Sequence, residues 1–281
     1  MARSPRPSRR SFLPFQMALA AVFLAAASPA HAQVKILING RNNQRPFNHG
    51  LPDQHAGFTF CRLHYDSVRR ARKSGWGDDY PNSDFNFMAR LEELTTVTLS
   101  RWENGDPGFA QFYPKDPDLL HCPFVKMNNA ANYDFTPDEV VAMRNYLLKG
   151  GFLWEDDNWT DFDWRYIRAN LERILPGYPI VELTPQHPLF SVLYHIKKLP
   201  QIPSLNAWLG SGQTNEQGPG TETPHYYAIF GENQRLMVLV SINSDVSDSW
   251  EREGDNQEYF YVFAGEGYAF GVNILMWVMT H

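Results

Sequence analysis

The chain has 281 residues, 43% of them hydrophobic, and a formal net charge of -6. Its first 32 residues contain four arginines and no acid, so the remainder is more acidic than the whole chain by four charges. Because an acidic surface repels phosphate backbones, we expect no nucleic-acid partner. Residues 33–281 are enough for one large domain.

The N-terminal segment has the pattern of an export signal. Arg9 and Arg10 precede an uncharged apolar run, Met17–Ala27, and Ala30-His31-Ala32 forms a small-x-small cleavage site. This pattern predicts a twin-arginine signal peptide over residues 1–32 and a periplasmic location. The apolar run is shorter than the ~20 residues of a membrane-spanning helix, and an uncleaved anchor is the alternative. After cleavage we expect no membrane span.

The next part of the chain predicts an arm and the first units of a domain. Residues 33–57 turn polar after a short apolar start and form the arm, and the domain extends over residues 58–281. The aromatic run Phe58–Tyr65 is typical of a strand. Apolar residues then recur at a spacing that places them on one face of a helix. They are Phe85, Met88, Leu91 and Leu94.

Two further apolar runs follow. Thr95–Leu99 is a short strand candidate rich in β-branched residues. Leu119–Met127 is a buried run that Pro123 interrupts. Because proline has no N–H for a sheet ladder, we expect an edge strand or a bulge there.

The strongest local signal is a helix over residues 137–149. Thr136 is a good N-cap, Pro137 suits the first helical position, and Glu139 completes a capping box. Gly150 and Gly151 provide the stop. A strand then runs from Gly151 into the acids at Asp157, and a helix follows from about Phe162 to Ile174.

The C-terminal part combines an irregular segment with regular elements. Residues 184–220 are rich in Pro, Gly and polar residues and predict an insertion that forms a lobe or lid. Strand candidates lie at 226–230 and 236–242, and the apolar run 268–279 predicts a helix packed on the sheet. Strands that alternate with helices indicate an α/β fold with a mostly parallel sheet covered on both faces.

Familiar catalytic motifs are missing from the sequence. It contains no nucleophile elbow, no histidine pair at metal-binding spacing, no P-loop and no G-x-G-x-x-G after a strand. We therefore predict no metal and no cofactor. Cys61 and Cys122 lie in apolar runs, and we favour buried free thiols, although a disulfide is the alternative if their Cα atoms lie within about 7 Å.

Tryptophan occurs beside acids at three places that each follow a predicted strand. In a parallel sheet such loops meet at the carboxyl-end edge, where ligands bind. Aromatic faces stack on sugar rings and carboxylates accept hydroxyl hydrogen bonds, which favours a polyol or glycan site. The same acids suit a hard cation such as Ca²⁺, a general acid and base pair, or plain helix caps. The candidate ligand-binding residues are Trp76, Asp79, Tyr80, Asp156, Asp157, Asn243, Asp245 and Trp250.

Several stretches together resemble one family. They are Arg62–Tyr65, Trp76–Asn86, Arg90–Thr95, Leu147–Asp157, His187–Phe190 and Asn243–Glu251. With these stretches, the chain from Phe58 to His281 resembles the domain of unknown function DUF4159, a group of exported bacterial proteins with a class I glutamine-amidotransferase-like fold. The resemblance implies a flavodoxin-like three-layer α/β/α sandwich and no established activity. Glutamine amidotransferases use a cysteine on an elbow, which this chain lacks.

Three functions remain as hypotheses. The first is a periplasmic ligand-binding or envelope-binding module that uses the Trp and Asp loops, with a glycan or cell-envelope component as partner. The second is a carbohydrate-directed or envelope-directed hydrolase, with Asp156 or Asp157 and Asp79 or Asp245 as acid and base. The third is a structural component of an envelope assembly, with residues 184–220 as its contact surface.

Overall fold

The computed structural model describes residues 50–52, 56–67 and 75–281. All of them belong to one compact unit, residues 34–281. The predicted signal peptide over residues 1–32 and most of the predicted arm over residues 33–57 lie outside the described residues.

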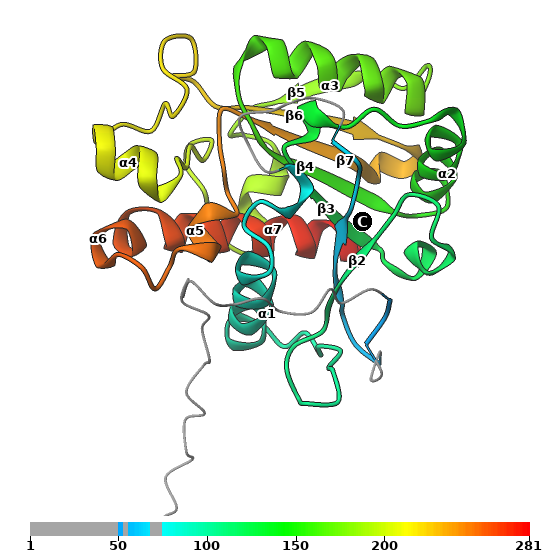
Figure 1. The fold of residues 1–281 in the computed structure, drawn as a ribbon, viewed down its shortest axis with the longest axis horizontal. Helices are drawn as coiled ribbons and strands as arrows, with labels where there is room; N and C mark the ends of the chain where they lie inside the picture. Colours follow the sequence, from blue (N-terminus) through cyan, green and yellow to red (C-terminus); the bar gives the residue numbers. More distant parts are fainter. Residues whose placement is uncertain (1–49, 53–55, 68–74) are drawn as a thin grey trace, which may run out of the picture. The chain divides into compact units, whose positions relative to one another are not determined.

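A seven-stranded sheet forms the middle layer (Figure 1). Its strands are β1 (Phe60–Leu63), β2 (Phe109–Phe112), β3 (Phe124–Asn128), β4 (Phe152–Asn158), β5 (Ile180–Leu183), β6 (His225–Phe230) and β7 (Leu236–Ile242). Their order is β2-β1-β3-β4-β7-β6-β5. Neighbouring strands are parallel from β2 to β7, whereas β6 is antiparallel to both β7 and β5. The sheet is therefore mostly parallel, as predicted.

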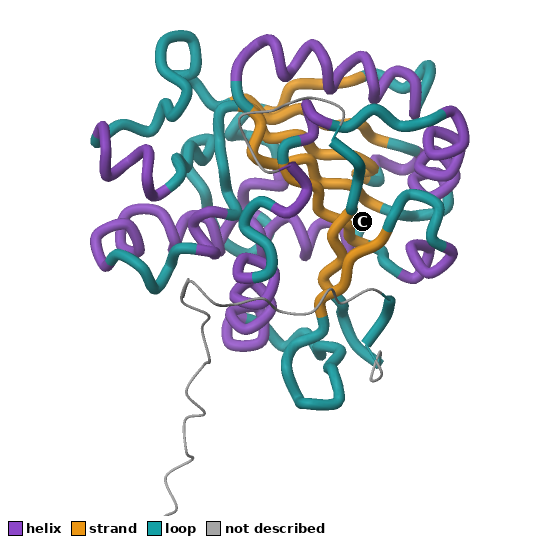
Figure 2. The backbone as a smooth tube through the Cα atoms, viewed as in Figure 1, coloured by secondary structure: helices purple, strands orange, loops and turns teal. Residues whose placement is uncertain are grey.

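Helices cover both faces of this sheet (Figure 2). The α-helices are α1 (Asn82–Leu94), α2 (Pro137–Leu148), α3 (Thr160–Ile174), α4 (Leu205–Ser211), α5 (Asp248–Glu251), α6 (Gln257–Tyr259) and α7 (Gly265–Thr280). Short 3-10 turns span Gly75–Gly77, Pro117–His121, Ala130–Asn132, Pro188–Ser191 and Glu232–Gln234, and a π-helical turn spans Phe260–Ala264. α1, α5 and α7 pack on one face, and α2 and α3 pack on the other. The fold is a three-layer α/β/α sandwich, consistent with a flavodoxin-like arrangement.

Most predicted elements have a direct counterpart. The expected capping box begins α2, where Thr136 N–H donates to Glu139 Oε2 at 2.9 Å and Glu139 N–H donates to Thr136 Oγ1 at 3.4 Å. The predicted strands at 58–65, 151–157, 226–230 and 236–242 correspond to β1, β4, β6 and β7. The predicted helices at 162–174 and 268–279 correspond to α3 and α7, each beginning two or three residues earlier.

Two expectations about strands are wrong, and one strand was missed. Thr95–Leu99 forms no strand, and Leu99 makes one isolated bridge with Phe58. β2 was not predicted, because Phe109-Ala110-Gln111-Phe112 is short and both of its faces are buried, so it lacks alternation. β3 lies in the interior of the sheet between β1 and β4, not at an edge. Pro123 precedes β3 and needs no ladder N–H, while its carbonyl accepts from Phe152 N–H.

The irregular segment 184–220 contributes to the core as well as to the surface. Its buried side chains pack with α7 on one face of the sheet, and they are Leu189, Phe190, Ile196, Ile202 and Leu205. The continuous helical stretch Gln257–Thr280 is long and apolar enough to cross a membrane, but 61% of its most apolar window is buried within the fold. This degree of burial is typical of a helix in the core of a folded domain.

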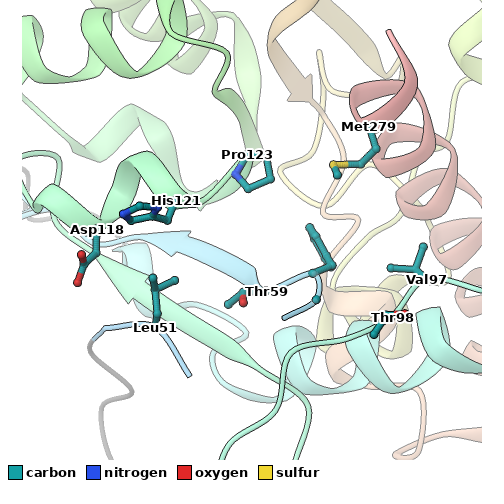
Figure 3. A pocket seen from close by; sticks show the side chains of 10 residues that line it. Leu51, Thr59, Val97, Thr98, Asp118, His121, Pro123 and Met279 are labelled. Carbon is teal, nitrogen blue, oxygen red and sulfur yellow. The ribbon is translucent and has the colours of Figure 1, made fainter. Parts of the chain in front are cut away.

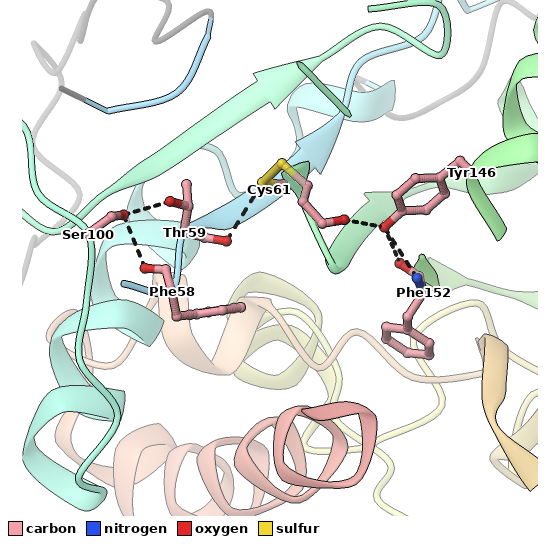
Figure 4. Close-up of a disulfide and its surroundings, with 7 residues drawn as sticks. Phe58, Thr59, Cys61, Ser100, Tyr146 and Phe152 are labelled. Atoms are coloured by element: carbon pink, nitrogen blue, oxygen red, sulfur yellow. Dashed lines mark hydrogen bonds between the residues drawn. A yellow bond between two sulfur atoms is a disulfide. The ribbon is translucent and has the colours of Figure 1, made fainter. Parts of the chain in front are cut away.

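The two cysteines form a disulfide, which corrects the preference for free thiols (Figure 4). Cys61 lies in β1 and Cys122 lies two residues before β3, and the parallel pairing of these strands brings the two Cα atoms to 6.1 Å. That separation is within the range of a disulfide. Tyr146 from α2 donates its hydroxyl to the Cys122 carbonyl at 2.7 Å, so the bridge is held against the helical layer.

The Cys61–Cys122 bridge closes a loop with a sequence separation of 61 residues. Replacing both cysteines by alanine is expected to lower the free energy of unfolding by about 2–5 kcal/mol, because the unfolded chain regains conformational freedom. Urea unfolding with and without dithiothreitol measures the effect. The reductant should destabilise the wild type and leave the double variant unchanged. A wild type insensitive to full reduction would contradict this account of the bridge.

Candidate functional site

The topology creates a switch point at the carboxyl ends of β1 and β3. The connection from β1 through α1 to β2 covers one face of the sheet, and the connection from β3 through α2 to β4 covers the other. The loops that leave β1 and β3 therefore turn in opposite directions. In open α/β sheets, ligands bind at such a switch point.

The loops after β1 and β3 meet through side-chain amides. Asn128 at the end of β3 donates its Nδ2 to the Asp79 carboxylate at 2.7 Å and to the Asp78 carbonyl at 3.2 Å. Asn129 donates its Nδ2 to the Asp78 carboxylate at 2.9 Å. These bonds attach the acids of the first loop to the end of the neighbouring strand.

The hydroxyl of Ser247 joins the other strand ends to this contact. It donates to Asp79 Oδ2 at 2.6 Å and accepts from Lys126 Nζ of β3 at 2.8 Å. It also lies 3.2 Å from Asp156 of β4 and 3.4 Å from Asp245 of the loop after β7. One buried hydroxyl thus contacts groups from the ends of β3, β4 and β7 and from the loop after β1.

Two buried cations lie side by side in this region. Arg62 of β1 and Lys126 of β3 are register partners, and both side chains are fully buried. Arg62 donates its Nε to Asp84 Oδ2 at 3.0 Å, and its Nη1 donates to the carbonyls of Trp76 and Asp78. Lys126 Nζ lies 3.2 Å from Asp156 Oδ2. Each cation is neutralised by its own aspartate.

Left-handed backbone recurs around the same edge. The φ angles are +62° at Asp79, +50° at Asn129, +56° at Asp157 and +60° at Asn243. Asn and Asp tolerate this conformation better than other side chains do, and its occurrence outside glycine often marks functional positions. Asp79, Asn129 and Asn243 follow β1, β3 and β7, and Asp157 is the last residue but one of β4, so the backbone departs from extended geometry at each of the converging strand ends.

Three carboxylates gather beside this network. One oxygen from each of Asp79, Asp248 and Glu251 lies within 4.8 Å of the others, and all three residues are buried. Burial and the neighbouring Asp79 raise the pKa of Asp248, and the same two causes raise the pKa of Glu251 to about 8. We call this group the carboxylate triad.

The predicted aromatic residues differ in how far a ligand can reach them. Trp76 and Tyr80 are partly exposed, with ring centroids 5.6 Å apart, and Trp76 stacks on His64 at 3.9 Å. Trp250 is 0% exposed and packs against Phe87 in the core. A sugar ring therefore has no free face of Trp250 on which to stack in this structure.

The predicted polar residues are buried within hydrogen-bond networks. Asp156 accepts from Ser247 N–H and pairs with Lys126, while Asp245 accepts from Asp248 N–H. Asn243 accepts from Thr160 N–H and donates to the Thr223 carbonyl.

Asp157 points elsewhere, toward Trp159, whose Nε1 donates to it at 3.0 Å. The structure thus brings Asp79, Asp156 and Asp245 together at Ser247 and leaves Asp157 outside that contact. The binding roles of these residues stay predictions.

Sequence reasoning missed several residues of this region, and two signals were available. Arg62 and Lys126 are single cations in otherwise apolar strands, a pattern that predicts buried ion pairs because such residues are rarely buried alone. Asp248 and Glu251 are three residues apart on α5, so they share one face of that helix. No sequence signal connected these residues to Asp79.

Glu155 is a buried acid on the opposite face of the sheet. It is 0% exposed, its Oε1 accepts from Tyr133 at 3.4 Å, and its Oε2 has no hydrogen-bond partner among the described residues. Burial raises its pKa from 4.5 to about 8. Glu155 therefore keeps its proton at neutral pH in the folded protein.

A separate pocket of 540 Å³ lies at the amino ends of the strands (Figure 3). Thr59, His121, Pro123 and Met279 are among its lining residues, and none of the predicted site residues is. Because ligands of parallel sheets bind at carboxyl ends, we assign the candidate site to the switch point and not to this pocket.

The fold and this edge define a three-layer α/β domain with a polar network at its switch point. The family model of a domain of unknown function, DUF4159, matches residues 59–279, so the chain belongs to that family. This confirms the family resemblance, while the link to the class I glutamine-amidotransferase superfamily stays a prediction. No curated protein matches the chain.

Glu155→Gln is expected to stabilise the protein increasingly as pH rises from 4.5 to 8. The folded pKa of Glu155 is raised to about 8, so the wild type loses stability across this interval while its unfolded state releases the proton. The gain should be near zero at pH 4 and roughly 4 to 5 kcal/mol at pH 8, by the scale of 1.36 kcal/mol per pKa unit. Urea unfolding at several pH values measures it, and Glu103→Gln, at an exposed acid, is the control. A pH-independent difference would contradict the buried proton.

Asp84→Asn should cost about 3 kcal/mol or more, because it leaves the buried Arg62 guanidinium without its carboxylate. The matched control is Glu92→Gln, which breaks the exposed pair with Arg101 and should cost no more than about 1 kcal/mol. Thermal and urea unfolding of both variants give the comparison. Equal losses would show that burial of the first pair is unimportant.

Proposed function

We propose that this protein is an exported, periplasmic module that binds a glycan or another cell-envelope component at the switch point. The observation that carries the proposal is the convergence of four strand ends on the Ser247 hydroxyl. Such convergence places polar groups from distant segments at one edge, where parallel-sheet domains bind ligands.

The side chains beside the switch point favour a hydroxyl-rich ligand. Trp76 and Tyr80 keep part of their rings exposed, and Asp78 and Asp79 lie in the same loop. An aromatic face covers the apolar side of a sugar ring, and neighbouring carboxylates accept hydrogen bonds from its hydroxyls. The ligand is expected to contact Trp76 and Tyr80, while Asp156, Asn243 and Asp245 hold the loops in place.

Export is supported by two independent features. Arg9 and Arg10 precede an apolar run and a small-x-small site, the pattern of a twin-arginine signal. The Cys61–Cys122 disulfide is of the kind that persists in oxidising compartments such as the periplasm.

A hydrolase is the second candidate, because Asp79 and Asp245 both contact the Ser247 hydroxyl and so lie close together. Paired carboxylates are the machinery of glycoside hydrolysis. All of the acids proposed for this role are buried, and Asp156 is already paired with Lys126. We therefore place binding before catalysis.

A thermal-shift screen with sugars and cell-wall fragments tests the binding proposal. A true ligand should stabilise the protein by about 2.7 kcal/mol at 100 times its Kd. Trp76→Ala should abolish the shift, whereas Trp102→Ala, in the loop that precedes β2 at the other end of the sheet, should retain it.

The same fragments should be recovered unchanged after incubation. Turnover that Asp79→Asn or Asp245→Asn abolishes would favour the hydrolase. If no fragment stabilises the wild type, the binding proposal fails.

A further inference from the structure

We propose that Asp79, Asp248 and Glu251 bind one hard divalent cation, Mg²⁺ or Ca²⁺, with the side-chain oxygen of Asn82 as a fourth ligand. The inference rests on the proposed function, since the cation would lie at the same edge of the sheet as the envelope ligand. Carboxylate and amide oxygens are the ligands that these cations prefer.

The carboxylate triad has the size of such a site. Its three oxygens lie within 4.8 Å of one another. Oxygens that bind one Ca²⁺ at 2.3–2.6 Å lie no more than about 5 Å apart, so the three fit around a single ion.

Protein donors already fix one oxygen of two of these carboxylates. Asp79 Oδ2 accepts from Asn128 and Ser247. Asp248 Oδ2 accepts from Leu205 N–H at 2.7 Å and from the Tyr259 hydroxyl at 3.0 Å. Asp248 and Glu251 are held three residues apart on one turn of α5. The carboxylates are thus positioned before any ion arrives.

Asn82 supplies an independent observation that points to a ligand. The residue is 3% exposed, and its Oδ1 has no hydrogen-bond partner among the described residues. A buried amide oxygen without a partner is costly, so such an atom is expected to find one.

The direction of Asn82 follows from its helix. Asn82, Asn86 and Arg90 lie one turn apart on α1 and share a face. Arg90 pairs with Glu253 at 2.9 Å, and Asn86 Nδ2 donates to the Trp250 carbonyl at 2.8 Å. The partners move back along the chain toward the start of α1, so by the same register we infer that Asn82 lies beside Ser247, whose hydroxyl contacts Asp79 of the carboxylate triad.

Among the described residues, the cations near the carboxylate triad are already paired with acids. Arg62 and Lys126 are paired with Asp84 and Asp156. Arg252 lies 2.8 Å from Glu251 and also 3.1 Å from Asp255, so it is shared between acids. A divalent cation would remove the repulsion that remains among the three carboxylates.

The test is calorimetric titration of MgCl2 and CaCl2, each alone, into the EDTA-treated, disulfide-bonded protein. We expect one site per chain. Glu251→Gln should weaken binding by tenfold or more, and Asn82→Ala should weaken it while Asn82→Asp restores it.

Glu258→Gln, at an exposed acid of the same segment, is the control and should bind as the wild type does. Because Glu251→Gln also removes the pair with Arg252, urea unfolding of the metal-free variant is measured beside the titration. A cooperative unfolding transition in the variant excludes misfolding as the cause of lost binding.

The absence of binding by the wild type up to about 10 mM, tenfold above the weakest extracellular Ca²⁺ sites, would overturn the inference. Unchanged binding by Glu251→Gln would do the same. Cell-wall fragments are titrated separately with EDTA and with the cation. If fragments bind in EDTA, the binding depends on Trp76 and the cation has no effect, the proposed function stands and the cation site is rejected. If the cation binds and no fragment produces a response, the cation site stands and the proposed function is rejected.

Discussion

The architecture of the candidate site depends on two cations buried side by side. Arg62 and Lys126 are register partners on adjacent parallel strands, and neither side chain reaches water. Each therefore needs an acid from another element, and Asp84 of α1 and Asp156 of β4 provide them. These two pairs attach α1 to β1 and β4 to β3 at the edge where the loops converge.

The positions of the other acids at this edge depend on the two ion pairs. Lys126 also donates to Ser247, whose hydroxyl donates to Asp79. Asp79 in turn lies beside Asp248 and Glu251, whose pKa values burial and Asp79 raise. Along this edge the side chains thus change over a short distance from two ion pairs to a cluster of three carboxylates. That cluster, beside the partly exposed Trp76 and Tyr80, is the chemical basis for both proposals.

The sequence predicted the layers well and the contacts poorly. Periodicity and caps identified α1 and α2, because these signals depend on neighbours a few residues away. The Cys61–Cys122 bridge, the interior position of β3 and strand β2 depend on which strands pair, and strand pairing is a long-range property.

The same distinction holds at the site. The Trp and Asp loops were expected to meet, and Asp79, Asp156 and Asp245 do so at Ser247. The burial of Trp250 and the partnership of Asp79 with Asp248 and Glu251 depend on how α5 packs, which no local pattern encodes.

The most direct test of ligand binding at the switch point is an NMR titration that follows the tryptophan indole N–H signals as cell-wall glycan fragments are added. The account predicts that the Trp76 signal shifts first and furthest, while Trp102 and Trp277, in the loop before β2 and near the end of α7, stay unchanged. Shifts confined to Trp102 or Trp277, with Trp76 unmoved, would place binding at the amino ends of the strands and contradict the account.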